Sequence, residues 1–268
     1  MCLILFDYAA GPKGHLYLAA NRDEWFRRPT EQARFWTDAP GILAGRDRSH
    51  QGTWLGVSRS GRFAAITNYR EPERHDPAAP SRGALTGAFL AGTMSAAVYA
   101  DQLASLAAQN DRHNGYNLLL HDGAELWYVS NRGSGAELVR PGLHGLSNHL
   151  LDTPWPKVTR GRERLAAALR HSQTALRRHA LFELLADRTP AQDAELPRST
   201  LALERERGLS ASHILMGSPD QPDTVYGTRS ATVISIDRHG IDFSERSFDT
   251  AAQVRSSMRE VIQRRTHR

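Results

Sequence analysis

The sequence predicts an α+β protein in which helices cover mainly antiparallel sheets. Apolar runs typical of strands come in consecutive pairs joined by short turns, and the predicted helices follow these pairs in groups. A parallel sheet would instead require strands and helices to alternate one by one. The 268 residues contain no internal repeat and no low-complexity linker, so we interpret residues 1–268 as one domain.

Hairpins are predicted where two short apolar runs flank residues that favour turns. Gly11–Gly14 separates the first two runs, Gly61 lies in the second turn, and Gly123 lies in the third. Glycine adopts backbone conformations that other residues avoid, which suits it to tight turns. The three predicted hairpins join residues 2–8 with 15–20, 52–57 with 63–68, and 117–120 with 125–129.

The predicted helices begin at residues that favour a helix start. Ser95 can accept a hydrogen bond from the first turn, and Pro156 is tolerated there because its missing N–H has no helical partner. Val98, Leu103 and Leu106 supply the expected apolar face of the helix that Ser95 caps. These helices cover residues 83–90, 95–106, 156–170 and 174–186.

The end of the chain is predicted to add strands and a final helix. Val254, Met258 and Val261 recur at helical spacing, which predicts a helix over residues 250–264. The strands are recognised by β-branched and apolar runs between turn residues. They cover residues 212–216, 224–236 and 241–248, and residues 145–148 form a strand end.

Composition narrows the classes of function. The chain has 34 Lys and Arg against 29 Asp and Glu, a formal net charge of +5 that could attract nucleic acid or acidic ligands. The basic residues are spread along the chain without a nucleic-acid-binding motif, so we expect no nucleic-acid partner. No apolar run reaches the roughly 18 residues of a membrane span, and a basic signal-like start is absent. These features favour a cytoplasmic protein.

Cys2 is the only cysteine, which excludes an internal disulfide and a cysteine-based zinc site. Initiator Met1 is normally removed before a small residue, and removal would leave a thiol and a free α-amine on Cys2. The pKa of an α-amine is about 7.7–8.0, so near neutral pH the amine can act as a base for its own thiol. The alternative is a small apolar residue buried in the first strand. Position alone leaves both interpretations open.

Other polar residues stand at predicted strand ends. Asn21–Glu24 follows the second apolar run, and Asn68 and Asn148 end two later runs. Side-chain amides are good donors to a developing oxyanion, although asparagine also favours ordinary turns. Arg229 lies within a predicted strand, where it faces either solvent or a site.

Together, several segments resemble the NRDE family, also called the transport and Golgi organisation 2 family. The most specific segments are Ala20–Glu24, Gly52–Gly56 and Asp152–Lys157, and the first contains the Asn-Arg-Asp-Glu of the family name. That family is similar, more distantly, to the cysteine N-terminal nucleophile hydrolases, which include penicillin V acylases and bile salt hydrolases. The resemblance implies a four-layer αββα sandwich of mainly antiparallel sheets.

The resemblance also implies site residues. Those hydrolases use an N-terminal Cys, an Asp after the second strand, two Asn at strand ends and a late Arg. The same types occur here in the same order, with Ala20 where the bile salt hydrolases carry an additional Arg. The implied catalytic residues are the nucleophile Cys2, Asp23 to orient its amine, the oxyanion donors Asn68 and Asn148, and Arg229 to favour the thiolate. The implied substrate-binding residues are Asn21, Arg22, Tyr69 and His149.

Two functions follow from the resemblance. The first is hydrolysis of an amide C–N bond or another acyl bond through a thioester on Cys2, with a small acyl or amide substrate. The second is binding and trafficking of haem or of an acyl-CoA or lipid-like ligand on the same scaffold. We expect no required cofactor and no metal, because the 12 histidines show no paired metal spacing. Haem is the one cofactor that we retain as a candidate ligand.

Overall fold

Two stacked antiparallel sheets form the centre of the protein. The computed structural model describes residues 2–11 and 13–263, and within them each sheet has seven strands. Sheet A has the order β10-β1-β2-β12-β13-β14, with β11 paired to β12. Its strands are β1 (Cys2–Ala9), β2 (His15–Trp25), β10 (Gly142–Leu146), β11 (Leu215–Met216), β12 (Tyr226–Asp237), β13 (Gly240–Phe248) and β14 (Val254–Gln263).

Sheet B is a simple meander in which each strand pairs with the next along the chain. Every pairing in both sheets is antiparallel. The strands of sheet B are β3 (Thr30–Phe35), β4 (Ile42–Asp47), β5 (Leu55–Ser58), β6 (Phe63–Asn68), β7 (Tyr116–His121), β8 (Leu126–Ser130) and β9 (Ala136–Leu138).

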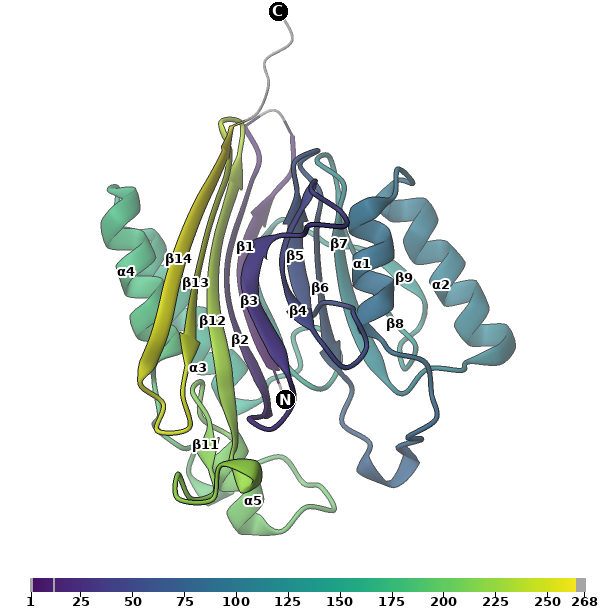
Figure 1. Cartoon of the computed structure of the whole chain (residues 1–268). Helices are drawn as coiled ribbons and strands as arrows, with labels where there is room; N and C mark the ends of the chain where they lie inside the picture. The colour runs from purple at the N-terminus through teal and green to yellow at the C-terminus, as the bar shows by residue number, and fades with distance from the viewer. Residues whose placement is uncertain (1, 12, 264–268) are drawn as a thin grey trace, which may run out of the picture.

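Helices cover the outer face of each sheet (Figure 1). On sheet B, α1 contacts β5 and β6 while α2 contacts β8 and β9; on sheet A, α3 contacts β1 and β10 while α4 contacts β2 and β12. The molecule is therefore the four-layer αββα sandwich that the resemblance implied. The helices are α1 (Gly83–Ala91), α2 (Ala96–Asn110), α3 (Pro156–Leu169), α4 (Thr174–Leu185) and α5 (Leu203–Leu209), with short 3-10 turns at Pro72–Arg74, Asp193–Glu195 and Pro222–Thr224.

Strand β1 shows why four layers form. Ile4 and Phe6 face the apolar layer between the sheets, whereas Leu3 and Leu5 face the layer under α3 and α4. Alternate residues of a strand point to opposite faces, so a strand that is apolar at every position must be covered on both sides. Each such side chain contributes roughly 1.5–3 kcal/mol on burial. A third apolar layer lies between sheet B and its helices, around Phe89.

The three predicted hairpins are confirmed, and so are the first four predicted helices. The Oγ of Ser95 accepts a hydrogen bond from the Val98 N–H at 3.3 Å, as a cap should. The predicted apolar face of α2 is wrong at two positions, since Val98 and Leu106 are 49% and 61% exposed. The helix instead packs through small side chains and Leu103.

The predicted final helix is also wrong, because residues 254–263 form β14 at the edge of sheet A. Met258 and Ile262 pack against the apolar layer between the sheets, with more exposed residues between them. The spacing of Val254, Met258 and Val261 imitates a helical face, but Val254 and Val261 are exposed. These residues form a strand because they pair with β13 along the length of β14. Residue 264 lies outside the described residues.

Candidate active site

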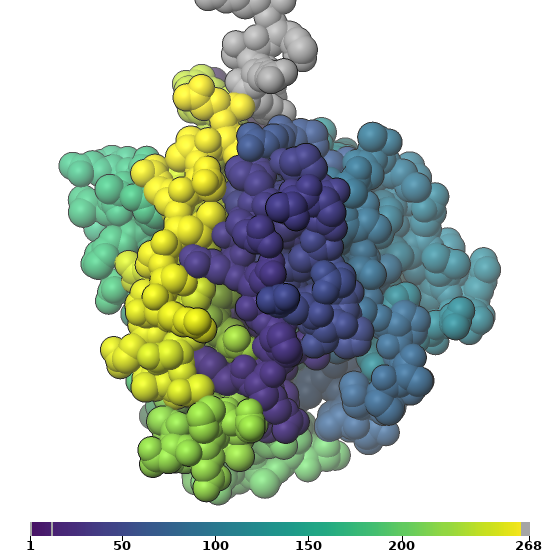
Figure 2. Space-filling model, viewed as in Figure 1, coloured from purple at the N-terminus to yellow at the C-terminus, as the bar shows by residue number. Residues whose placement is uncertain are grey.

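A cavity of about 280 Å3 opens at one end of the sandwich, with Cys2 in its wall. The ends of β1, β2 and β6 form part of its wall, and residues 75–83 cover another part. In the lower half of Figure 2 this recess lies between the purple N-terminal segment and the blue loop. Its lining includes Cys2, Arg22, Asp23, Glu24, Arg28, Asp47, His50, Trp54, Asn68, His75, Arg82 and Asn114.

The backbone of Cys2 is held by the two residues that follow β10. The Cys2 N–H donates to Asn148 Oδ1 at 3.2 Å, and Ser147 Oγ donates to the Cys2 carbonyl at 2.9 Å. Asn148 Nδ2 in turn donates to the Asn68 carbonyl at 2.7 Å, so one buried amide ties β1 to the end of β6. The side chain of Asn68 is exposed and lines the cavity. The two asparagines therefore differ: Asn148 positions Cys2, and Asn68 presents its amide to a ligand.

Asp23 is buried close to a buried lysine. Its Oδ1 accepts a hydrogen bond from Thr228 Oγ1 at 2.7 Å, across the β2–β12 pair. Burial raises the pKa of Asp23, and the charge of Lys157 is one of the effects that oppose this. Burial likewise lowers the pKa of Lys157 to about 8, while Asp23 acts to raise it. Among the described residues the Lys157 Nζ has no hydrogen-bond partner.

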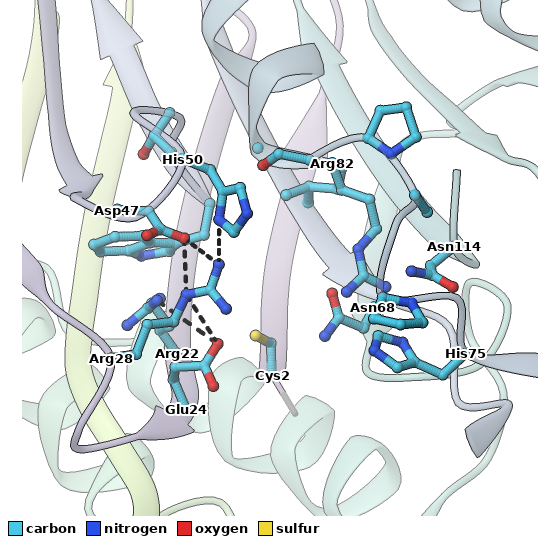
Figure 3. A pocket seen from close by; sticks show the side chains of 18 of the residues that line it. Cys2, Arg22, Glu24, Arg28, Asp47, His50, Asn68, His75, Arg82 and Asn114 are labelled. Carbon is cyan, nitrogen blue, oxygen red and sulfur yellow. Dashed lines mark hydrogen bonds and ion pairs between the residues drawn. The ribbon is translucent and has the colours of Figure 1, made fainter. Parts of the chain in front are cut away.

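A network of ion pairs lines the side of the cavity formed by β2 and β4 (Figure 3). Arg28 donates to Asp47 Oδ2 at 2.6 Å and lies 3.8 Å from Glu24 Oε2, which is also 3.8 Å from Arg22. Arg22 stacks over the Trp54 ring at 4.2 Å. Burial lowers the pKa of Arg22, and the charges of Glu24 and Cys2 oppose this. We call Arg22, Glu24, Arg28 and Asp47 the paired side.

The opposite side of the cavity is lined by two amides, a histidine, an aspartate (Asp76) and one arginine, and Figure 3 draws no interaction between those that it labels. Arg82 Nη1 donates to the Gly115 carbonyl at 2.9 Å. Within the described residues no carboxylate forms an ion pair with its guanidinium. Burial lowers the pKa of Arg82, and the negative charge of Cys2 is the largest effect that opposes this. We call Asn68, His75, Arg82 and Asn114 the loop side.

The structure does not bring Arg229 to Cys2. A register shift between Thr228 and Ser230 takes Arg229 out of the regular β2–β12 pairing. Its Nη1 donates to the carbonyls of Trp25, Phe26 and Arg28 at 3.0–3.2 Å and so holds the loop after β2. Its role beside the thiolate is therefore corrected. Arg22 and Arg82 are the arginines that line the cavity with Cys2, together with Arg28.

Asn21 is likewise misplaced by the sequence prediction. The predicted polar strand end is part of β2, which continues to Trp25. Alternate residues of β2 face opposite sides, so Asn21 points under the helices and donates to the carbonyls of Leu185 and Ser212, both at 2.8 Å. The substrate-binding assignment of Asn21 is corrected, whereas Arg22 does line the cavity.

Tyr69 and His149 form a pair beside a second cavity of about 360 Å3. Tyr69 lines this cavity, and its Oη lies 2.9 Å from His149 Nε2, whose other ring nitrogen lies 2.9 Å from Thr153 Oγ1. Burial lowers the pKa of His149. The four residues of the loop side line both cavities, so the two are neighbouring compartments. His149 itself is not among the lining residues and orients Tyr69.

Sequence reasoning assigned no role to Lys157, Arg82, Glu24, Arg28 or Asp47. Lys157 carried a signal, because it is one of two lysines in an Arg-rich chain and lies in a specific motif. Glu24 also lies in a segment that resembles the family, Ala20–Glu24. Arg82 carried no signal, because it follows a polar loop of ordinary composition.

The strand pairing and helix packing define a four-layer αββα sandwich, and its first strand carries a cysteine into a cavity. Within the described residues no cluster of three His, Cys, Asp or Glu could hold a metal ion, and no helix is long and apolar enough to cross a membrane.

The chain belongs to the Transport and Golgi organisation 2 family, whose model matches residues 1–250. It is 34% identical over 261 residues to the Transport and Golgi organization 2 homolog of Mus musculus, which covers 92% of this chain and 93% of the relative. The Homo sapiens homolog is 36% identical over 263 residues with the same coverage. The Drosophila melanogaster protein is 27% identical over 265 residues and 88% of each chain.

Two solved structures are similar at lower levels. One is a Caenorhabditis elegans ortholog of N-acylethanolamine-hydrolyzing acid amidase, with a TM-score of 0.47, 9% identity, and coverage of 87% of this chain and 92% of that one. The other is a mutant conjugated bile acid hydrolase from Clostridium perfringens, with a TM-score of 0.47, 8% identity, and coverage of 97% and 92%. The layer assignment rests on the strand pairing and helix packing described above.

Proposed function

We propose that this protein is a cysteine hydrolase of the N-terminal nucleophile type, which cleaves an amide or another acyl bond through a thioester on Cys2. The observation that supports this most is the placement of Cys2. Its nitrogen is held by Asn148, and Cys2 lines the same cavity as Asn68 and Arg82. A merely structural cysteine would not need to line a cavity.

The first half of the reaction forms the thioester. Once Met1, which lies outside the described residues, is removed, the Cys2 nitrogen is an α-amine that takes the proton from Sγ. The thiolate attacks the acyl carbonyl and forms a C–S bond, while negative charge develops on the carbonyl oxygen. The Asn68 amide donates a hydrogen bond to this oxygen. The C–N bond then breaks, and the leaving nitrogen takes the proton held by the α-amine.

The second half returns the enzyme to its starting state. The α-amine takes a proton from water, and the resulting hydroxide attacks the thioester carbonyl. The C–S bond breaks, a carboxylic acid leaves, and Sγ regains the proton. Asn148 Oδ1 orients the amine throughout, because it accepts the hydrogen bond that the Cys2 nitrogen donates. Asp23 on β2 and Lys157 on α3 are both buried, and the charge of each opposes the effect of burial on the pKa of the other.

Mass spectrometry tests the proposal. The protein lacking Met1 is incubated with a panel of N-acyl amides and activated acyl esters, quenched with acid and digested. We expect an acyl adduct on the peptide that begins with Cys2, and no adduct in Cys2→Ala. A Cys2 that forms no adduct with any donor, and that is alkylated no faster than glutathione, would contradict the proposal.

A carrier function is the second candidate. The cavity beside Tyr69 is also lined by Leu201, Leu209 and Tyr226, so it can accept an apolar group of a lipid-like ligand, an acyl-CoA or haem. His75 is exposed at both cavities and is the histidine best placed to meet haem. Titration of haem and of long-chain acyl-CoA into Cys2→Ala tests this, with His75→Ala as the matched control. Tight binding without any acyl adduct would favour the carrier.

A cytoplasmic location is part of the same proposal. A reducing compartment would keep the one thiol of the chain available as a nucleophile. Cell fractionation with an antibody to the protein tests it, and recovery with a membrane or periplasmic marker would contradict it.

A further inference from the structure

The arginines of the cavity differ in what neutralises them. Arg28 is paired with Asp47 and Glu24, and Arg22 lies 3.8 Å from Glu24 and stacks on Trp54. Arg82 faces the same cavity with no carboxylate in ion-pair distance within the described residues. One cation next to Cys2 is therefore left for a ligand.

The nearby acids are committed elsewhere. Glu71 accepts hydrogen bonds from Arg132 at 2.6 and 2.8 Å and from the Gly115 N–H at 3.1 Å. Asp76 lies in the same loop and lines the same cavity, but it forms no ion pair with Arg82 within the described residues, and its Oδ1 accepts the Ala78 N–H at 2.8 Å. A partly buried guanidinium without a counter-ion loses hydration that one hydrogen bond to a carbonyl replaces only in part, so its interaction energy increases when an anion binds.

Arg82 is also held in place before any ligand binds. Its Nη1 donates to the Gly115 carbonyl, which leaves the other edge of the guanidinium free for two parallel hydrogen bonds. Residue 83 packs directly on Gly52, where an added Cβ would come within 2.5 Å of the Gly83 backbone. Asn114 exchanges two hydrogen bonds with the backbone of Asp76, at 2.7 and 2.8 Å, and ties the loop to β7. A preorganised site loses less entropy on binding.

We propose that Arg82 binds a carboxylate of the substrate, so that the compound attacked by Cys2 is an acyl compound that carries one negative charge close to the bond that is cleaved. This inference rests on the proposed function, because it names the substrate of that site. One uncompensated guanidinium matches one carboxylate. A dianionic phosphate would have only one unpaired cation to offset its charge, with the Asp76 carboxylate in the same cavity.

Alkylation of Cys2 with a charged and a neutral reagent tests this without any knowledge of the substrate. Rates with iodoacetate and iodoacetamide are measured for the full chain and divided by the corresponding rates for glutathione. We expect the normalised ratio of iodoacetate to iodoacetamide to exceed one and to fall about tenfold in Arg82→Gln, the effect of one charge a few ångströms away at intermediate dielectric. Arg82→Lys should retain most of the excess of the iodoacetate rate over the iodoacetamide rate.

Arg74→Gln is the matched control, because Arg74 lies in the same loop, is exposed, and does not line the cavity. Its ratio should equal that of the unchanged protein. A measurement on the unchanged protein covers the event that Arg82→Gln does not fold: 1 M NaCl should remove most of the iodoacetate excess and leave the iodoacetamide rate unchanged.

The outcomes separate the two proposals. Rapid alkylation by both reagents with the same ratio in the unchanged protein and in Arg82→Gln would overturn the carboxylate site and leave the hydrolase proposal standing. Alkylation no faster than glutathione with both reagents would overturn the hydrolase and this inference with it. In a substrate panel, N-acyl amino acids should be preferred to the matching N-acyl ethanolamines and to their phosphate esters. Preference for the phosphate esters would contradict the carboxylate assignment.

Discussion

The two sides of the cavity are built from different chemistry. On the paired side, two arginines and two carboxylates neutralise one another, and β2, the turn that follows it and β4 hold them (Figure 3). On the loop side, amides, an exposed histidine and one arginine without a carboxylate partner face the same space. The charge of a paired arginine is already offset by its partner, so it attracts an anion less strongly than an arginine without an ion pair does. The comparison assigns stability to one side and ligand recognition to the other, with Cys2 between them.

Cys2→Ser should produce the largest effect on turnover, because Cys2 is the proposed nucleophile and lies between the two sides of the cavity. A hydroxyl is far harder to deprotonate than a thiol, so we expect turnover to fall by more than about 1,000-fold. The unfolding free energy should change by less than about 1 kcal/mol, because the substitution is nearly isosteric. Steady-state kinetics and urea denaturation measure the two quantities. Retention of a tenth of the activity would show that Cys2 is not the nucleophile.

Asn68→Ala and Asn148→Ala should separate the two amides. Asn68→Ala removes an oxyanion donor, which typically costs about 100- to 1,000-fold in kcat, and should leave the unfolding free energy nearly unchanged. Asn148→Ala should lower both turnover and stability, because Asn148 is buried and bridges Cys2 to Asn68. Cys2 should stay alkylatable in both variants. Equal loss of stability in the two would contradict this division of roles.

The buried acid Glu245 interacts electrostatically with Arg22 of the paired side, and its protonation affects the free energy of unfolding. Glu245 accepts the Ala33 N–H at 2.8 Å, and burial raises its pKa from 4.5 to about 7. The folded state therefore holds this proton more tightly than the unfolded state does. Stability should fall by up to about 3 kcal/mol as the pH rises from 4.5 to 7, with no further loss above pH 7.

Glu245→Gln should flatten this pH dependence, because it removes the titrating group and keeps the acceptor for the Ala33 N–H. Urea denaturation at pH 5 and pH 8 measures it. The exposed Glu183→Gln is the control and should retain the slope of the unchanged protein. A slope that Glu245→Gln leaves intact would assign the pH dependence to another group.

The smallest expected effects are losses of unfolding free energy, measured for one variant on each side of the cavity. Asp47→Asn removes the closest partner of Arg28 and should cost about 1–2 kcal/mol of unfolding free energy. Arg82→Gln should cost less, about 0.5–1 kcal/mol, since it removes one hydrogen bond to the Gly115 carbonyl and breaks no ion pair. Urea denaturation of both variants in the same buffer measures the difference. A larger loss for Arg82→Gln would reverse the comparison and make the loop side structural.

Local sequence patterns were sufficient to predict most of the helices and strands. Turn glycines and apolar runs predicted the pairs β1–β2, β5–β6 and β7–β8, and helix-start residues predicted α2 and α3. These features depend on interactions between residues close in the chain, which a single sequence displays. The same reasoning was wrong for residues 254–263, where helical spacing of three apolar residues competed with a partner strand.

The sequence by itself determined the fold class and the family, because short-range patterns and specific motifs carry that information, and the nucleophilic role of Cys2 stays a prediction. Only the tertiary structure decided which side chains reach Cys2. A register shift turned Arg229 to the loop after β2, and strand alternation turned Asn21 under the helices. Arg82 reached the cavity through the path of a loop, and the pKa of Lys157 fell because neighbouring elements exclude water from it. Side-chain direction, bulges and desolvation depend on contacts between residues far apart in the chain, and no local pattern records them.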